Sequence, residues 1–390
     1  MSDDGAKVVF RAMMVVWAVL AVVSVRFTSQ DGAGFVAAGS QVAHGDVDVV
    51  YAGEGDKFGI TDERTRHLIC DGADPATPCE SYARYLSTPA ALPLLVPFGL
   101  GSIELGVFLW RIPIVASLIW GMVLLRQRAA RTPHGPTLLA ASAVLLTPAV
   151  HFLVVMGQTS SSMFLAVALG VTGAAAGGVR RVGAVASATV AIVTKILPVL
   201  TLVPLFLLGA RRAALATAAT VAALAAVITL LGGPGIWSDY LHLTSAVADT
   251  TESTPLSARL TRWVPLPILV VLLGAFGAAL WARRRALAAD VVFAGAWVIA
   301  LALTPFLWNH YLWVCFAALV ITYAEQASKP ALVGAGAFAV GSALVHLQGS
   351  PEAYPLVRVA IVVVTAGVLL HAAFAGTTRS ETRAVPTAGP

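Results

Sequence analysis

Two carboxylates lie two residues apart, at Asp46 and Asp48, in a polar stretch that follows the first apolar segment. A carboxylate that reaches an acceptor hydroxyl can take its proton, as the general base of a group transfer does. A solvated acidic loop is the alternative explanation. The pair is therefore a candidate base that needs support from other residues.

One lysine, Lys195, lies inside an apolar run. An ionisable group in a membrane helix costs about 2.5 to 3.5 kcal/mol on insertion scales, and it marks a candidate functional site. Its ammonium could neutralise a lipid phosphate, because a point charge needs no fixed geometry. The alternative is a lysine that snorkels and pairs with a carbonyl or a carboxylate.

Two polar turns carry further candidates. Gly157 permits a sharp turn, and Gln158 after it offers an amide donor and an acceptor to a sugar hydroxyl. Trp308 and His310 lie in a second turn, which combines an indole with an imidazole. Taken alone, the first is an ordinary polar loop and the second an aromatic anchor at the membrane interface.

The elements that must position these residues are membrane helices. Hydrophobic residues make up 58% of the 390 residues and charged residues only 12%, with a mean hydropathy of +0.83, which leaves too little polar surface for a soluble globule. A spanning helix needs about 20 apolar residues, and segments of about this length recur along the chain. We predict one all-α integral membrane domain over residues 1–375, followed by a disordered tail at 376–390. The twelve predicted crossings are 8–27, 103–125, 136–154, 160–178, 182–194, 197–209, 213–232, 266–282, 288–304, 311–325, 331–347 and 355–375.

The distribution of charge predicts the orientation of these helices. Arginine and lysine gather in short connections, as the positive-inside rule expects of cytoplasmic turns. The residues concerned are Lys7, Arg11, Arg126, Arg128, Arg131, Arg180, Arg181, Arg211, Arg212, Arg283, Arg284, Arg285, Lys329, Arg379 and Arg383. Acidic residues gather in two large connections, 28–89 and 233–265, which we predict to be outside. An even number of crossings then places both termini in the cytoplasm.

Residues 182–209 must cross twice, because a basic pair flanks each end of this single apolar run. We therefore predict two short helices joined near Lys195 and Pro198. Such short helices leave backbone groups unpaired unless protein or a water-filled cavity surrounds the break, so the break predicts a cavity wall. The Pro-broken apolar segment 88–97 is predicted to lie along the outer interface.

The cysteines and the first apolar stretch allow three smaller predictions. Cys70 and Cys79 share the first outer segment, so an oxidising compartment predicts a disulfide between them, with two free thiols as the alternative. Cys315 lies in an apolar run and is predicted to be inert packing. The stretch 12–25 could be a signal peptide, but no convincing small-residue cleavage site precedes Arg26, which favours an uncleaved helix.

The candidate residues follow one another in an order that resembles a known family. In chain order they are Asp46 with Tyr51, the Pro-bearing segment 88–97, Gly157-Gln158, Lys195-x-x-Pro198 and Pro305-x-x-Trp308-x-His310. From about residue 44 to 325, the chain resembles the polyprenyl-phosphate-mannose-dependent alpha-mannosyltransferases of glycosyltransferase family 87, in the C-type multipass superfamily. Three positions depart from the usual pattern. Gly-Gln-Thr-Ser replaces Gly-Gln-x-Asn, Thr-Pro-Ala replaces Tyr-Pro-Pro, and Tyr311 replaces a second histidine.

The resemblance implies an inverting enzyme with an outward-facing site. An outer carboxylate would deprotonate the acceptor hydroxyl as it attacks the anomeric carbon, and the polyprenyl phosphate would leave. Asp46 matches this base, with Asp48 as the second candidate. The implied donor-binding residues are Lys195, Arg259 and Arg262 for the phosphate, His310 for phosphate or sugar, Trp308 for the sugar face and Gln158 for a sugar hydroxyl.

The resemblance also implies partners and a location. The partners are a polyprenyl-phosphate mannose donor, a glycolipid or polysaccharide acceptor of the cell envelope and the lipid bilayer, with no nucleic acid, no cofactor and no metal. The location is the plasma membrane. The alternatives are a polyprenyl-phosphate-arabinose-dependent arabinofuranosyltransferase, a twelve-span transporter or flippase, and a non-catalytic assembly partner. Transporters usually show two similar halves, and residues 8–209 do not resemble 213–375.

Overall fold

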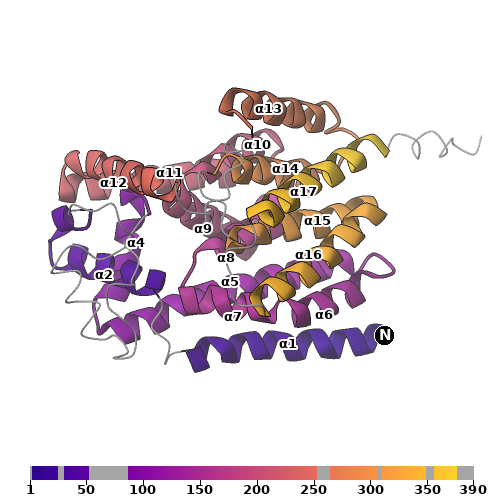
Figure 1. The fold of residues 1–390 in the computed structure, drawn as a ribbon, viewed down its shortest axis with the longest axis horizontal. Helices are drawn as coiled ribbons and strands as arrows, with labels where there is room; N and C mark the ends of the chain where they lie inside the picture. Colours follow the sequence, from indigo (N-terminus) through magenta and orange to yellow (C-terminus); the bar gives the residue numbers. More distant parts are fainter. Residues whose placement is uncertain are drawn as a thin grey trace, which may run out of the picture.

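The computed structural model describes residues 2–24, 30–51, 87–252, 264–304, 309–347 and 355–375, and these residues form helices and turns without any strand. Long helices lie roughly alongside one another in a bundle (Figure 1). In chain order, the elements are α1 (Asp3–Val23), α2 (Gln30–Ala43), η2 (Val47–Val49), η4 (Pro89–Ala91), α4 (Leu92–Gly99), α5 (Ile103–Ala129), α6 (Gly135–Leu145), α7 (Thr147–Met156), α8 (Ser160–Ala176), α9 (Gly178–Lys195), η5 (Leu197–Thr201), α10 (Leu202–Leu207), α11 (Arg211–Gly232), α12 (Gly235–Glu252), α13 (Leu266–Ala282), α14 (Ala289–Ala302), η7 (Asn309–Leu312), α15 (Trp313–Gln326), α16 (Lys329–Leu347) and α17 (Pro355–Ala375).

The predicted membrane segments correspond to helices of the bundle. Among the described residues, four helices are long and apolar enough to cross a membrane, namely α1, α5, α11 and α17. The pair α6 and α7 counts as a fifth if the 52° bend between them lies within one span. Other predicted crossings correspond to shorter apolar helices, such as α8, α13 and α14. The all-helical membrane fold is confirmed, whereas the number of twelve crossings stays a prediction.

Three helices lie in or beside the two segments that we predicted to be large outer connections. These are α2, α4 and α12, which gather at one end of the bundle, at the left of Figure 1. Helix α4 forms within the Pro-broken segment, with Pro97 inside it. Helix α2 packs against α4 so closely that a Cβ added at Gly39 would clash with the Leu95 carbonyl. This end of the molecule is therefore a packed helical cap.

The core between α1, α5, α8 and α15 is built on aromatic contacts. Trp313 lies edge-on to Trp17, with ring centroids 6.1 Å apart, and edge-on to Phe164 at 5.4 Å. Both arrangements are favoured by the quadrupoles of the rings. Gly121 on α5 faces the Phe164 ring so closely that a side chain there would displace it. The buried indole N–H of Trp17 donates to Thr147 Oγ1 at 3.1 Å. These contacts hold the central helices in a fixed relative position.

The basic clusters meet at the end of the bundle opposite this cap. Arg126 lies over the Phe10 ring (5.3 Å to its centroid), Arg180 bonds to Gln127 (3.5 Å), Arg181 and Arg212 line one cavity, and Arg283 lies over the Phe374 ring (5.1 Å). The beginning of α1 and the end of α17 lie on the same side, at the right of Figure 1. One end of the bundle therefore carries the charges that the positive-inside rule assigns to a single face.

A buried ionic network ties three helices together at this basic end. Asp290 on α14 is 2% exposed and accepts hydrogen bonds from the Thr172 backbone N–H at 3.0 Å and from the Thr172 hydroxyl at 2.7 Å. The guanidinium of Arg128 on α5 pairs with the same carboxylate and donates to the Leu169 carbonyl at 2.9 Å. Gly170 interrupts α8 here with φ +61°, and a Cβ at this position would lie 2.5 Å from Asp290 Oδ1. The glycine gives the carboxylate access to the backbone of α8.

Candidate active site

Helix α9 ends at the break that the sequence predicts. Its last residue is Lys195, and Ile196 adopts φ +46° and ψ −51°, which a β-branched residue rarely does. Pro198 then opens the short 3₁₀ turn η5. The hydroxyl of Thr88, which precedes η4, donates to the Val193 carbonyl in the last turn of α9. The break is confirmed, although α9 begins at Gly178 rather than at the predicted residue 182, so its 18 residues extend about 27 Å.

Lys195 meets the second predicted turn. Its Nζ lies 5.2 Å from the ring centroid of Tyr311, within the range of a cation–π contact. His310, next to it in η7, is 8% exposed and stands edge-on to the Tyr311 ring at 4.6 Å. The Lys195 side chain itself is only partly buried. The structure thus brings together two predicted donor-binding residues that lie 115 positions apart in the chain.

The first predicted turn lies beside the same helix end. Gly157 ends α7 in the left-handed conformation, with φ +68°, as its sequence position predicted. Its carbonyl accepts a hydrogen bond from the buried Trp110 indole at 2.9 Å. Gln158 follows and is 7% exposed. The hydroxyl of the next residue, Thr159, bonds to that of Thr194 at 3.0 Å, so the Gln158 turn is adjacent to Lys195.

Tyrosines connect this region to the segment that carries the carboxylates. Tyr51 is 4% exposed; its hydroxyl donates to the Ser87 carbonyl at 2.7 Å, and its ring stands edge-on to Tyr240 of α12 at 5.7 Å. Burial raises the pKa of the Tyr240 phenol, and the neighbouring Tyr311 raises it further. Tyr311 in turn lies against Lys195. Ser87 precedes Thr88, whose hydroxyl donates to the Val193 carbonyl, so a short series of hydrogen bonds leads from the Asp46–Tyr51 segment to the end of α9.

The two candidate bases differ in their surroundings. Asp46 occupies the N-cap position of η2, is partly buried, and donates its backbone N–H to the Gln41 carbonyl at 2.9 Å. Asp48 lies within η2 and is exposed. The turn between them packs on the end of α11, where a Cβ at Gly232 would lie 2.7 Å from Val47 Cγ1. Asp46 is therefore the less exposed of the two carboxylates.

Several predicted residues lie outside the part of the chain that the structure describes. They are Trp308, Arg259, Arg262, Cys70 and Cys79. Their roles and the predicted disulfide stay predictions. Cys315, by contrast, is described, fully buried and free, as expected of a packing residue. Within the described ranges, no three His, Cys, Asp or Glu side chains gather as a metal site would require.

The sequence analysis did not single out two buried arginines of the helical bundle. Arg358 is 2% exposed near the start of α17, a helix that packs against η7. Arg111 is fully buried in α5, and its guanidinium donates to the Ser24 carbonyl at the end of α1. Both are ionisable groups inside predicted crossings, so the rule that singled out Lys195 would also have found them. Tyr240 carried no comparable signal, because an aromatic residue near the membrane edge is commonplace.

A family model for glycosyltransferase family 87 matches residues 85–293, more than half of the chain. The matched region contains Gln158 and Lys195, whereas Asp46, Asp48 and His310 lie outside it. Neither a curated protein nor a solved structure matches the chain. The apolar helices and the matched region lead to one conclusion: the chain belongs to glycosyltransferase family 87 and is a membrane glycosyltransferase.

Proposed function

We propose that this glycosyltransferase moves mannose from a polyprenyl-phosphate donor to a glycolipid or polysaccharide acceptor of the cell envelope, with inversion at the anomeric carbon. The observation that carries the proposal is the position of Lys195. It ends a broken apolar helix and lies against the ring of Tyr311, the chain neighbour of His310. Hydrogen bonds from Tyr51 to Ser87 and from Thr88 to Val193 connect the end of this helix to the carboxylate segment. A cation at membrane depth beside a polar turn suits a lipid-linked phosphate.

The proposed reaction is a single displacement. Asp46 accepts the proton of the acceptor hydroxyl as its oxygen forms the new bond to the anomeric carbon. The bond between that carbon and the phosphate oxygen breaks, and the electron pair leaves with the polyprenyl phosphate. The ammonium of Lys195 stabilises the charge that develops on the phosphate. No redox cofactor or metal takes part in these steps.

The other proposed roles follow from side-chain chemistry. His310 bonds to the phosphate or to the sugar, and Gln158 positions a sugar hydroxyl. Trp308 stacks on the sugar face, and Arg259 and Arg262 assist with the phosphate. Asp48 is the second candidate for the base. These roles rest on residue type and on the proximity of the two polar turns to the end of α9.

We further propose that the protein lies in the plasma membrane with twelve crossings, both termini in the cytoplasm and the active site outside. Two observations support this orientation. The basic clusters share one end of the bundle, and the candidate site lies beside the cap of α2, α4 and α12 at the other end. The positive-inside rule places the basic end in the cytoplasm.

The test is transfer from radiolabelled polyprenyl-phosphate mannose in membranes that contain the full chain, with cell-envelope lipids as acceptors. Asp46→Asn removes the base at nearly constant volume, and we expect it to lower the transfer rate by about 100-fold or more. Asp48→Asn is the matched control and should have a much smaller effect. Equal and mild losses from both variants would refute the assignment. Transfer from polyprenyl-phosphate arabinose instead of mannose would change the donor but not the reaction.

A further inference from the structure

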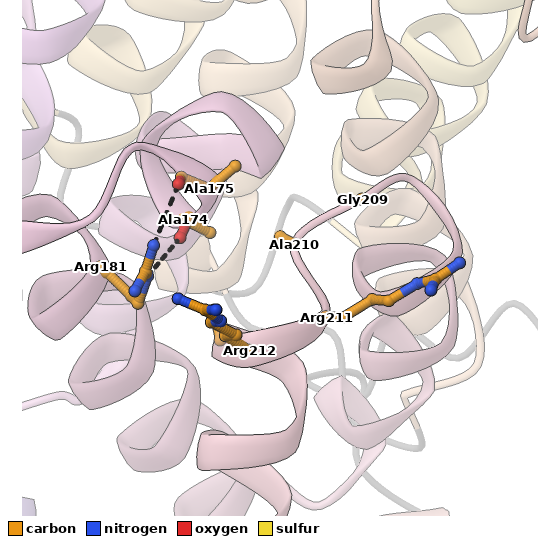
Figure 2. Close-up of a pocket in the computed structure, with 8 residues that line it drawn as sticks. Ala174, Ala175, Arg181, Gly209, Ala210, Arg211 and Arg212 are labelled. Carbon is orange, nitrogen blue, oxygen red and sulfur yellow. Dashed lines mark hydrogen bonds between the residues drawn. The ribbon is translucent and has the colours of Figure 1, made fainter.

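A cavity opens at the basic end of the bundle, at the opposite end of α9 from Lys195. Its volume is about 300 Å³, and it lies between the end of α8, the first turn of α9 and the beginning of α11. Figure 2 shows Arg181 and Arg212 at this cavity, together with the backbone carbonyls of Ala174 and Ala175. None of the described residues that line it is acidic. Two guanidinium groups therefore lie at this cavity without a carboxylate among its described lining residues.

Arg181 is held in place by the end of α8. Its Nη2 donates to the Ala175 carbonyl at 3.2 Å and its Nε to the Ala174 carbonyl at 3.4 Å. These carbonyls belong to the last turn of α8, where backbone oxygens have no partner within the helix. Arg212 is exposed and extends toward Arg181 across the cavity (Figure 2). One arginine is thus fixed, and the other can close on a ligand.

The beginning of α11 adds donors of its own. The N-cap residue, Ala210, provides no side-chain hydrogen bond, so the first N–H groups of this 22-residue helix lack a side-chain cap. Arg211 and Arg212 occupy the first turn, at the positive end of the helix dipole, where a cation is disfavoured. An anion in the cavity would satisfy the N–H groups and offset the repulsion between the arginines.

The positive-inside rule alone does not explain this geometry. Arg180 carries the same topological signal as Arg181, but it is exposed and contacts Gln127 at 3.5 Å instead of lining the cavity. Arg211 also lines the cavity, but its guanidinium lies 5.4 Å from the Phe206 ring centroid and points away from Arg181 and Arg212 (Figure 2). Each basic pair therefore has one guanidinium directed to the cavity and one directed elsewhere.

We propose that this cavity binds a phosphate group, and that the phosphate is the headgroup of an anionic phospholipid in the adjoining leaflet. Guanidinium groups match the geometry of a phosphate, and basic pockets between membrane helices on the cytoplasmic side commonly bind lipid headgroups. Because α11 is long and apolar enough to cross a membrane, a bilayer that contained it would have its boundary with water near the first turn of the helix. The site is separate from the proposed catalytic residues, so its test does not depend on transferase activity.

The experiment titrates the full-length, detergent-solubilised protein with dihexanoyl phosphatidylglycerol and reads the affinity from the shift in thermal unfolding. Dihexanoyl phosphatidylcholine and inorganic phosphate are titrated in parallel to separate an anionic lipid from a zwitterionic lipid and from a free anion. Arg181→Gln and Arg212→Gln should each weaken phosphatidylglycerol binding by about tenfold, the loss expected for a charge-assisted hydrogen bond. Arg180→Gln and Arg211→Gln remove the same charge from the same helices and should leave the affinity within about twofold.

The titrations distinguish a lipid site from a site for a soluble anion and from general surface charge. Inorganic phosphate binding with the same dependence on the variants supports the phosphate site and assigns it to a soluble ligand rather than to a lipid. Equal weakening by all four variants would show only general surface charge and would overturn the site, as would no effect from Arg181→Gln or Arg212→Gln. Equal affinity for phosphatidylcholine would overturn the requirement for an anionic lipid. In the described part of the chain, Arg181 forms hydrogen bonds with α8 and Arg212 forms none, so Arg212→Gln decides the question even if Arg181→Gln unfolds the protein.

Discussion

Replacing Lys195 by Met tests whether its charge serves the substrate or the fold. Methionine keeps most of the apolar stem and removes only the ammonium. In the described part of the chain, no carboxylate forms an ion pair with Lys195; its characterised contact is the Tyr311 ring at 5.2 Å. A cation–π contact contributes about 0.5 to 2 kcal/mol, whereas a stranded buried carboxylate would cost about 3 to 5 kcal/mol. We therefore expect Lys195→Met to lower the free energy of unfolding by no more than about 2 kcal/mol.

The effect on the reaction should be larger than the effect on the fold. Losing one preorganised group that stabilises charge in the transition state typically lowers the rate by about 100-fold to 1,000-fold. Lys195→Met should therefore accumulate normally and transfer sugar at least about 100-fold more slowly, with weaker binding of the polyprenyl-phosphate donor. Lys195→Arg should recover part of the rate, because it restores the charge but introduces a planar group.

The assay combines three measurements on one purified preparation: thermal unfolding in detergent, donor binding and transfer rate. The reasoning fails if Lys195→Met folds poorly, because the lysine would then be structural. It also fails if the variant folds well and binds donor as tightly as the parent. In that case, Arg259 and Arg262 become the leading candidates for the phosphate.

Three further predictions concern the basic end and the orientation. Asp290→Asn should lower the free energy of unfolding by about 3 to 5 kcal/mol, because Asp290 is 2% exposed and pairs with Arg128. Glu325 is 26% exposed and lies 3.5 Å from the same guanidinium, so Glu325→Gln should lower it by less than about 1 kcal/mol. Gly170→Ala should lower the unfolding temperature measurably, because φ is +61° and the added Cβ would lie 2.5 Å from the Asp290 carboxylate. In reduced intact cells, a membrane-impermeant thiol reagent should label Cys70 and spare a cysteine placed at Arg284; the reverse pattern would invert the orientation.

The sequence predicted the long helices well because their main determinant is local composition. Apolar segments of sufficient length, punctuated by arginine, correspond to α1, α5, α11 and α17. It did not predict α2 or α12. Helix α2 has only 14 residues, and its glycines disfavour an isolated helix. It is stabilised by packing against α4, at a contact between Gly39 and Leu95 that no local pattern reveals.

In the candidate site, too, local features were predictable from the sequence and contacts between distant segments were not. A lysine in an apolar run stands out in the sequence because burying a charge is costly, so Lys195 and the break beside it were predictable. The contacts that surround it join distant segments, as when Tyr51 reaches Ser87, 36 residues away, or Thr88 reaches Val193, 105 residues away. Such pairings depend on the arrangement of helices in space. The choice between Asp46 and Asp48 stays a prediction from the register with Tyr51, to which the structure adds that Asp46 is partly buried and Asp48 exposed.

The geometry at the end of α9 indicates what fixes the lysine in place. Ile196 adopts φ +46°, and a β-branched residue in this region costs on the order of 1 to 3 kcal/mol, so the surrounding structure must maintain it. Thr88 supplies one restraint through the Val193 carbonyl, and Thr159 supplies another through Thr194. Both restraints come from outside α9, and both act within two residues of Lys195. The position of the Lys195 ammonium therefore depends on η4 and on the beginning of α8 as much as on its own helix. These contacts link the outer cap to the proposed site for the donor phosphate at Lys195.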